Sequence, residues 1–194
     1  MIYGKDADRD QVPKPAIRPY PRQYATELVI RDGTRLQIRP IRPEDEGALA
    51  QFHATLSGAS VFKRYFSLLP LEARIRHERL LRRCCIDYDR QMALLAERSS
   101  EGQIVGVGRL IKSPCRKEAE LAAIVSEAWQ RQGIGRALVR GLMQFARDEK
   151  LQNVKAFVLA DNGAMQKLLK DEGFVFQDCG ASDVWEAQIS LDPH

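Results

Sequence analysis

A glycine-containing segment in the second half of the chain has the residue types that bind phosphate. It reads Gln130-Arg131-Gln132-Gly133-Ile134-Gly135-Arg136 and joins a predicted strand to a predicted helix. Glycines at the start of a helix leave backbone N–H groups exposed, and the helix dipole adds about half a positive charge there. Arg131 and Arg136 could add charge-assisted hydrogen bonds. We therefore expect this segment to bind a phosphate or pyrophosphate group.

The spacing of this segment excludes two other phosphate-binding loops. A P-loop ends in Gly-Lys followed by Ser or Thr, and neither the lysine nor the hydroxyl is present here. A dinucleotide-binding fingerprint needs Gly or Ala at the sixth position counted from Gly133, where this chain has Leu138. The segment therefore belongs to a different kind of phosphate loop.

Two regular elements must hold this segment in place. The preceding residues, Glu118–Val125, are predicted to form a strand, and a helix is expected from Gly133 to about Lys150 because its apolar residues recur at helical spacing. The apolar face of this helix consists of Ile134, Leu138, Leu142 and Phe145. The next strand, Val154–Leu159, is nearly all apolar, which is typical of a covered, central position.

The hydrophobic pattern predicts further strands and helices on both sides of this unit. Further strands are expected at 28–30, 36–38, 91–97, 104–111, 174–177 and 184–191, and helices at 43–55, 60–84 with a break at Pro70, and 162–172. Asp32-Gly33 joins the first two strands as a tight hairpin. The order predicts an α/β (α+β) fold: a mostly antiparallel central sheet with one central strand–helix–strand crossover and flanking helices.

Proline content divides the chain of 194 residues into two parts. Four of the nine prolines lie in residues 1–22, which have no helical or strand period, so we expect a linker there and one folded domain over 23–194. No apolar run approaches the ~18 residues of a membrane span, and the N-terminus has no signal-type apolar core, so a cytoplasmic location is the default expectation. The 4 cysteines and 3 histidines show no zinc spacing, so no metal site is expected.

The net charge of +4 is concentrated in one predicted helical region. Residues 63–83 contain 7 basic and 2 acidic side chains, which makes this segment +5 and the remainder of the chain −1. The segment could dock onto an acidic protein surface or guard the acceptor entrance, or it could be a solvated helix face. We take the solvated face as the default interpretation. Nucleic-acid binding is not expected, because few aromatic residues are interleaved with the basic ones.

Two motifs in the same order resemble the GNAT superfamily of acyl-CoA-dependent N-acyltransferases. Residues 130–135 match the [QR]-x-x-G-x-[GA] loop of that family, which holds the pyrophosphate of coenzyme A. Residues 162–174 resemble its second motif, a helix that begins with Asn162 and ends in Gly173-Phe174. The resemblance covers about residues 27–191 and implies acetyl-CoA as the acyl donor. It also implies cofactor contacts for Ile124, Val125 and Met165, and for Asn162, which by itself is also a favoured helix N-cap.

A closer resemblance is to the GNAT domains of bacterial protein lysine acetyltransferases. It rests on three short segments, which are Ala16-Ile17-Arg18-Pro19-Tyr20-Pro21, Arg31-Asp32-Gly33-Thr34 with residues 38–46, and Arg64-Tyr65-Phe66. The resemblance implies that the acceptor is a lysine of another protein, and specifically of an acyl-CoA synthetase. It also implies that the proline-rich linker connects to an upstream fused or regulatory domain.

The resemblance also implies a general base. A lysine amine has a pKa near 10.4, so only about one in a few thousand is free base at neutral pH and attack on a thioester needs a proton acceptor. Glu120, in the context Ala119-Glu120-Leu121-Ala122, matches the glutamate that fills this role in the family. Apolar neighbours could raise its pKa, and strand alternation places Glu118 on the same face as a rival base. A backbone N–H near Val125 is the implied donor to the thioester oxygen.

One position departs from the family pattern. Many members have a tyrosine proton donor seven residues after the motif asparagine, where this chain has Leu169. We therefore assign no general acid; Tyr88 or a water molecule could substitute. Two other functions share the cofactor site, namely acetylation of a small amine or amino acid, and a non-catalytic acyl-CoA-sensing module.

Overall fold

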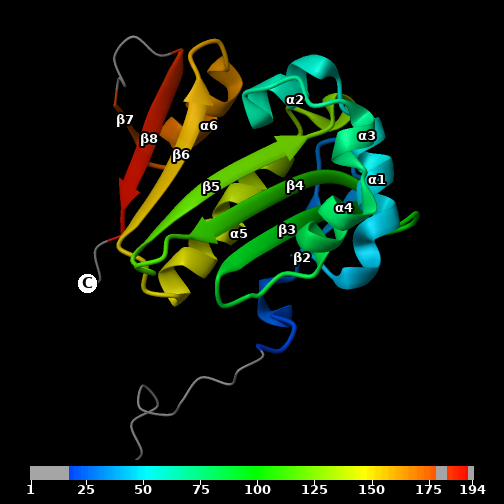
Figure 1. The fold of residues 1–194 in the computed structure, drawn as a ribbon, viewed down its shortest axis with the longest axis horizontal. Coiled ribbons are helices and arrows are strands. Elements are labelled where there is room, and N and C mark those ends of the chain that lie inside the picture. Colours follow the sequence, from blue (N-terminus) through cyan, green and yellow to red (C-terminus); the bar gives the residue numbers. More distant parts are fainter. Residues whose placement is uncertain (1–17, 178–182, 192–194) are drawn as a thin grey trace, which may run out of the picture.

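The computed structural model describes residues 18–177 and 183–191 (Figure 1). Within them the strands are β1 (Thr26–Val29), β2 (Arg35–Pro40), β3 (Gln91–Arg98), β4 (Gln103–Lys112), β5 (Glu118–Val125), β6 (Asn153–Leu159), β7 (Val175–Gln177) and β8 (Val184–Ser190). The α-helices are α1 (Glu46–Ala54), α2 (Gly58–Tyr65), α3 (Leu71–Arg74), α4 (His77–Cys84), α5 (Ile134–Asp148) and α6 (Gly163–Asp171). Short 3-10 turns cover Arg22–Tyr24, Pro43–Asp45 and Glu127–Trp129.

The strands form one sheet in the order β1-β2-β3-β4-β5-β6-β8-β7. Every neighbouring pair in this order is antiparallel except β5 and β6, which run parallel and are connected through α5. The predicted fold class is therefore confirmed. The crossover occurs where we expected it, because a parallel pair needs a long connection that returns the chain to the same end of the sheet.

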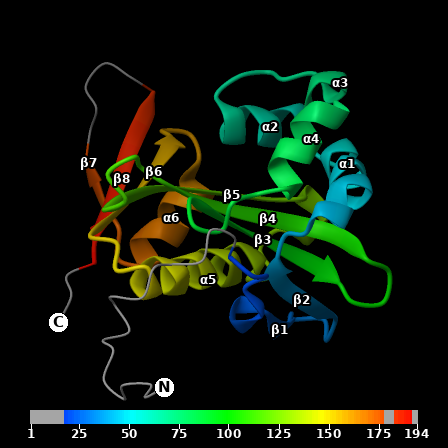
Figure 2. The same cartoon turned by 60° about the horizontal axis from the view of Figure 1, so that its bottom comes forward.

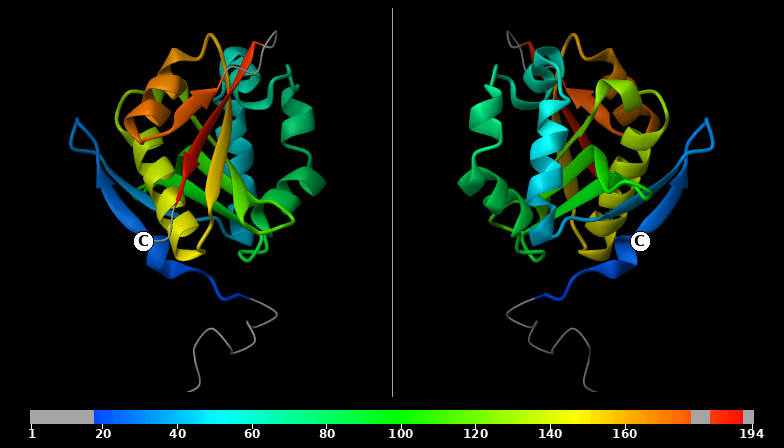
Figure 3. Two further views of the ribbon diagram at one scale, coloured as in Figure 1. Left: turned by 90° about the vertical axis from the view of Figure 1, so that its left-hand side faces the viewer. Right: turned by 90° about the vertical axis from the view of Figure 1, so that its right-hand side faces the viewer.

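The helices form two layers on opposite faces of the sheet (Figures 1 and 2). Helices α5 and α6 cover one face, where Leu138, Leu142 and Leu169 pack on β3–β6 in the larger hydrophobic core. Helices α1–α4 lie over β3, β4 and β5 on the other face, around a smaller core that includes Phe52 and Leu95. Figure 3 shows the same two layers from the sides. Alternate residues of each central strand therefore contact different helical layers.

Two predictions about individual elements need correction. The predicted helical region 60–84 is three helices rather than two, because α3 ends at Arg74 and the chain turns again before α4. Strand β6 is covered on one face only, since Val154, Ala156 and Val158 are buried but Phe157 is 40% exposed. The physical reason is that α1–α4 do not extend over β6, so its second face has no helix above it (Figure 2).

Part of the predicted linker lies against the domain. Arg18 forms ion pairs with Asp89 and Glu149, and the Tyr20 hydroxyl donates to the carbonyl of Pro40 at 2.9 Å. Residues 18–22 are thus attached to the sheet and to the end of α5. The boundary at residue 22 stays a prediction, and residues 1–17, Cys179 and His194 lie outside the described residues.

The described ranges contain neither a membrane-spanning helix nor a cluster of metal ligands. No helix in residues 18–177 or 183–191 combines the length and the apolar composition needed to cross a bilayer. In the same ranges, no group of three or more His, Cys, Asp or Glu side chains is arranged to hold a metal ion.

Candidate functional site

The central feature of the site is the divergence of β5 and β6. The two strands pair over only three positions, Glu118–Glu120 opposite Asn153–Lys155. Beyond these positions β5 stays with β4 up to Val125, and β6 stays with β8 up to Leu159 (Figure 1). The edge of β5 that faces β6 therefore has no strand partner after its third residue. Such an edge leaves backbone hydrogen-bonding groups open to a ligand.

The N-terminus of α5 lies beside this divergence. A Cβ atom built on Gly135 would come within 3.9 Å of the Val125 side chain at the end of β5. No backbone or side-chain acceptor in the described part of the chain pairs with the N–H groups of residues 131–136, and α5 has no side-chain N-cap. These donors and the positive end of the helix dipole face the same region. The geometry is that of an anion site.

The two glycines of this segment serve different purposes. Gly133 has a φ of +91°, and a Cβ there would meet nothing within 4 Å, so this residue is needed for its backbone conformation. At Gly135 a Cβ would lie 3.2 Å from Cδ1 of Leu168, so this residue allows α5 to approach α6 closely. The prediction that glycine exposes the amides therefore applies to Gly133, whereas Gly135 is a packing requirement.

The two arginines of the segment also differ. Arg136 forms ion pairs with Asp171 at 2.5 Å and with Glu172 at 3.2 Å, which fixes its guanidinium against the end of α6. Arg131 is exposed and forms no ion pair with the described residues. The charge of Arg131 is therefore not paired within the described residues, which favours Arg131 as the phosphate contact. Arg136 could contact a phosphate only if its guanidinium bound the phosphate and the two carboxylates together, so this role stays a prediction.

Two side-chain amides, those of Gln130 and Asn162, stabilise the loops around this region. The Gln130 amide donates to the carbonyl of Val125 at 3.0 Å and so fixes the loop to the end of β5. Oε1 of Gln132 is buried without a partner among the described residues. Asn162 accepts from the N–H of Met165 at 3.3 Å, which confirms the N-cap interpretation. Met165 itself is half-buried against the larger core, so the cofactor contacts of both residues stay predictions.

Glu120 lies at the last paired position before β5 and β6 diverge. Its Cα partners are Ile111 on β4 and Lys155 on β6. Its side chain is exposed on the face that carries α1–α4, so the expected apolar surroundings are absent in this structure. Glu118 is half-buried on the same face, two residues farther from the divergence. Of the two carboxylates, Glu120 is therefore the one adjacent to the open edge.

The two residues at the end of β5 face different layers. Val125 packs toward α5 in the larger core, and Ile124 packs toward α1–α4 in the smaller one. A ligand on one face of the sheet would contact only one of these two residues. The expected cofactor contacts of both Ile124 and Val125 therefore require the ligand to lie along the edge of β5. The edge of β5 that faces β6 has no strand partner after Glu120, and both contacts stay predictions.

Residue 169, where many family members have the tyrosine proton donor, lies in the hydrophobic core of this chain. Leu169 is completely buried, so no proton donor could act from there. Tyr88 does not replace it, because its hydroxyl donates to the carbonyl of Ile41 near the first residues of β3, far from the C-terminal end of β5. Burial raises the pKa of Tyr88 to about 12. We therefore do not assign Tyr88 as the proton donor to the leaving thiolate.

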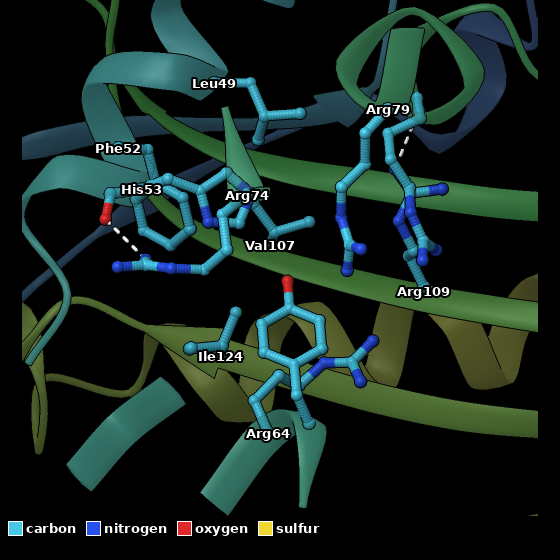
Figure 4. A pocket seen from close by; sticks show the side chains of 11 residues that line it. Leu49, Phe52, His53, Arg64, Arg74, Arg79, Val107, Arg109 and Ile124 are labelled. Carbon is cyan, nitrogen blue, oxygen red and sulfur yellow. Dashed lines mark hydrogen bonds between the residues drawn. The ribbon is translucent and has the colours of Figure 1, made fainter. Parts of the chain in front are cut away.

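A pocket lined by five arginines lies on the same face of the sheet as Glu120. We call it the arginine pocket; its arginines are Arg64, Arg74, Arg79, Arg83 and Arg109 (Figure 4). Arg74 and Arg109 are only 6% and 5% exposed, and the other three are half-buried. A solvated helix face is therefore the wrong interpretation for the part of the basic segment that includes Arg74. The three short helices fold back on one another and direct these side chains inward.

Sequence reasoning missed Arg109 altogether. The signal that could have identified it is a single charge within the apolar strand 104–111, since an uncompensated buried charge is costly and rare without a function. Burial, followed by the nearby Arg83 and Arg64, lowers the pKa of Arg109 to about 10. The arginines thus repel one another in a partly apolar environment.

His53 lies in the positive electrostatic potential of the same arginines, and its protonation makes the stability of the fold depend on pH. Its Nδ1 is buried with no partner among the described residues, and burial, followed by Arg74, Arg79 and other arginines, lowers its pKa to about 4. The folded state therefore binds a proton less readily than the unfolded chain, so stability falls as the pH drops from 6.5 toward 4. We expect this histidine to account for about 2 kcal/mol of the loss between pH 6.5 and 4.5. Urea unfolding of a His53→Phe variant should show a correspondingly smaller loss, and equal losses in both proteins would contradict this assignment.

Comparisons with known proteins agree with this geometry. The model of the Acetyltransferase (GNAT) domain family matches residues 35–175, more than half of the chain. An acetyltransferase of Pseudomonas aeruginosa is 30% identical over 148 residues, which cover 75% of this chain and 78% of that protein.

Two solved structures have a similar fold. The GNAT domain of S. lividans PAT has a TM-score of 0.80 and 25% identity, covering 89% of this chain and 100% of that one. An acetyltransferase of Salmonella typhimurium, solved with its cofactor acetyl-CoA, has a TM-score of 0.61 and 21% identity, covering 82% of this chain and 95% of that one. The chain therefore belongs to the GNAT acetyltransferase family, whose members take the acetyl group from acetyl-CoA.

Proposed function

We propose that this acetyltransferase transfers an acetyl group from acetyl-CoA to the side-chain amine of a protein lysine, by direct attack in a ternary complex. The observation that carries the proposal is the position of Glu120. It is an exposed carboxylate at the point where β5 and β6 diverge, on the face opposite α5 and α6. A base in this position is open to an acceptor arriving from the α1–α4 side.

The fit of coenzyme A to the site follows from the residues present. The unpaired N–H groups of residues 131–136 and the Arg131 guanidinium would hold its pyrophosphate, and the open edge of β5 would accept amides of the pantetheine arm. When bound, acetyl-CoA supplies a thioester whose carbonyl carbon is the electrophile. The remaining catalytic groups belong to this chain.

The chemical step needs a proton acceptor and an oxyanion donor. Glu120, directly or through one water, takes a proton from the lysine ammonium, and the free amine nitrogen then forms a bond to the acyl carbon. A backbone N–H near Val125 stabilises the negative charge that develops on the carbonyl oxygen. The carbon–sulfur bond then breaks, and the sulfur leaves as a thiolate. The nitrogen releases its second proton to solvent to give the neutral amide, and the thiolate takes a proton from solvent. A thiol with a pKa near 8.5 needs no dedicated acid for this departure.

The closer sequence resemblance supports one class of acceptor. The segments that resemble bacterial protein lysine acetyltransferases, together with the similarity to the GNAT domain of S. lividans PAT, support an acyl-CoA synthetase as the protein substrate. The same resemblance supports a fused or regulatory domain as the partner of the proline-rich residues 1–22, and a cytoplasmic location stays an expectation.

A lysate experiment tests this proposal. The purified protein and labelled acetyl-CoA are added to a cell lysate, and the products are identified by mass spectrometry. We expect acetyl-lysine on one or a few proteins, including an acyl-CoA synthetase. Label confined to small molecules would instead support an amine or amino-acid acetyltransferase, a candidate favoured by the small size of the arginine pocket. Tight CoA binding without any transfer would support the acyl-CoA-sensing alternative, for which Leu169 is the motivation.

A further inference from the structure

The arginine pocket contains more positive charge than the chain neutralises. Arg74 donates to the carbonyls of His53 at 2.7 Å and Leu69 at 3.1 Å, and Arg109 donates to the carbonyl of Arg83 at 2.6 Å. These acceptors are uncharged. None of the five arginines forms an ion pair with a carboxylate in residues 18–177 or 183–191. Several partly buried cations without a counter-charge are unfavourable, because desolvation is not repaid by Coulomb attraction.

The arginines converge from four elements of the fold. Arg64 comes from α2, Arg74 from α3, Arg79 and Arg83 from α4, and Arg109 from β4 (Figure 4). Such convergence cannot arise from one solvated helix face. An arrangement that gathers charges of one sign around one pocket, at a cost in stability, is typical of a binding site for the opposite charge.

The walls and the volume of the pocket indicate the kind of anion. Apolar side chains, among them Phe52, Val107 and Ile124, line the pocket between the arginines and strengthen electrostatic attraction by excluding water. The cavity volume is about 20 Å³, which is enough for one or two oxygen-sized groups. Guanidinium groups match the two oxygens of a carboxylate in a bidentate geometry. The site thus fits a carboxylate better than a larger phosphate ester.

The pocket lies next to the proposed base. Arg109 pairs across the sheet with Ala122, which is two residues from Glu120 and therefore about 7 Å away along β5. Glu120 also contributes to the electrostatic environment of Arg64, which comes from α2 on the same face of the sheet. An acceptor with its carboxylate in the pocket would have its other end over Glu120.

We propose that the arginine pocket binds a carboxylate of the acceptor and thereby places the acceptor amine beside Glu120. The carboxylate belongs either to an acidic residue near the target lysine or to a free amino acid. The anion site stands on the pocket alone, whereas its part in acceptor binding rests on the proposed function. The two parts are therefore tested separately.

The anion site is tested by binding in the absence of acetyl-CoA. Succinate is titrated into the full chain at constant ionic strength, and binding is measured by calorimetry. We expect saturable binding that is weakened at least about 10-fold in Arg79→Gln, since one charge-assisted hydrogen bond is lost. Arg79 is half-buried, so this variant should fold, and urea unfolding verifies that it does. Arg147→Gln, an exposed arginine on α5 across the sheet, is the matched control and should bind as the wild type does.

The acceptor role is tested by steady-state kinetics. Two kinds of acceptor are used, each with an uncharged control. The first is a lysine peptide with Asp, or as the control Asn, beside the lysine, and the second is free glutamate, with its uncharged amide analogues as the control. We expect Arg79→Gln to raise the KM of the carboxylate-bearing acceptors about 10-fold while the KM of acetyl-CoA stays unchanged. The better substrate of the two kinds identifies the source of the carboxylate.

The possible failures are distinguishable. Absence of saturable succinate binding, or equal binding by wild type and Arg79→Gln, overturns the anion site. Binding that is lost in Arg79→Gln without any change in acceptor KM, or without any turnover, overturns the acceptor role and leaves the site intact.

Discussion

Replacement of Glu120 by glutamine is expected to lower kcat by about 10²- to 10⁴-fold, the usual contribution of a positioned general base. Glutamine keeps the size of the side chain but cannot take the proton from the attacking ammonium. Binding of acetyl-CoA should stay within about twofold of the wild-type value, because the proposed pyrophosphate site at α5 is formed by other residues. Initial rates with saturating acetyl-CoA and calorimetric titration measure the two effects separately.

Glu118→Gln is the matched control for this experiment. Glu118 lies on the same strand and the same face, but at the first of the three paired positions, two residues farther from the divergence of β5 and β6 than Glu120. We expect its rate to remain close to that of the wild type. A wild-type rate in Glu120→Gln, or an equal loss in Glu118→Gln, would remove Glu120 from its assigned role.

Replacement of Gly133 by valine is expected to weaken acetyl-CoA binding about 100-fold. A β-branched residue is strongly disfavoured at a φ of +91°, so the loop must change its conformation and its N–H groups lose their common direction. The loss of one or two charge-assisted hydrogen bonds to a pyrophosphate accounts for an effect of this size. Calorimetric titration of the variant with acetyl-CoA measures it.

Gly33→Val separates this effect from general backbone strain. Gly33, in the hairpin turn between β1 and β2, has a φ of +86°, and a Cβ there would also meet nothing within 4 Å. The two variants should therefore lose similar stability in urea unfolding, but only Gly133→Val should lose affinity. A similar loss of affinity in both would mean that the loop at α5 has no special part in binding.

The central unit of the fold could be predicted because its signals are local. The predicted strand Glu118–Val125 has the observed bounds of β5, and the helix expected from Gly133 is α5, which begins one residue later. Binary patterning and a glycine at the helix start determine both elements without help from distant residues. Leu169 was likewise identified as a departure from the family pattern, and its complete burial explains why no proton donor is found there.

The arginine pocket could not be predicted from the sequence, because it depends on tertiary convergence. A charge count finds the basic segment but not the direction of each side chain, which changes at the two turns that separate α2, α3 and α4. Arg109 is 26 residues beyond Arg83 in the sequence, yet its guanidinium donates to the carbonyl of that residue. The exposure of Phe157 was missed for a similar reason, since a continuous apolar run does not reveal which layer covers it.

Coenzyme A binding at the α5 loop can be observed directly by NMR titration of the ¹⁵N-labelled protein with coenzyme A. We expect saturable shifts of the backbone amide signals of residues 131–136, together with those of Ile124 and Val125 at the end of β5. This expectation would be contradicted if coenzyme A produced no saturable shifts, or if the largest shifts occurred on elements away from the divergence of β5 and β6.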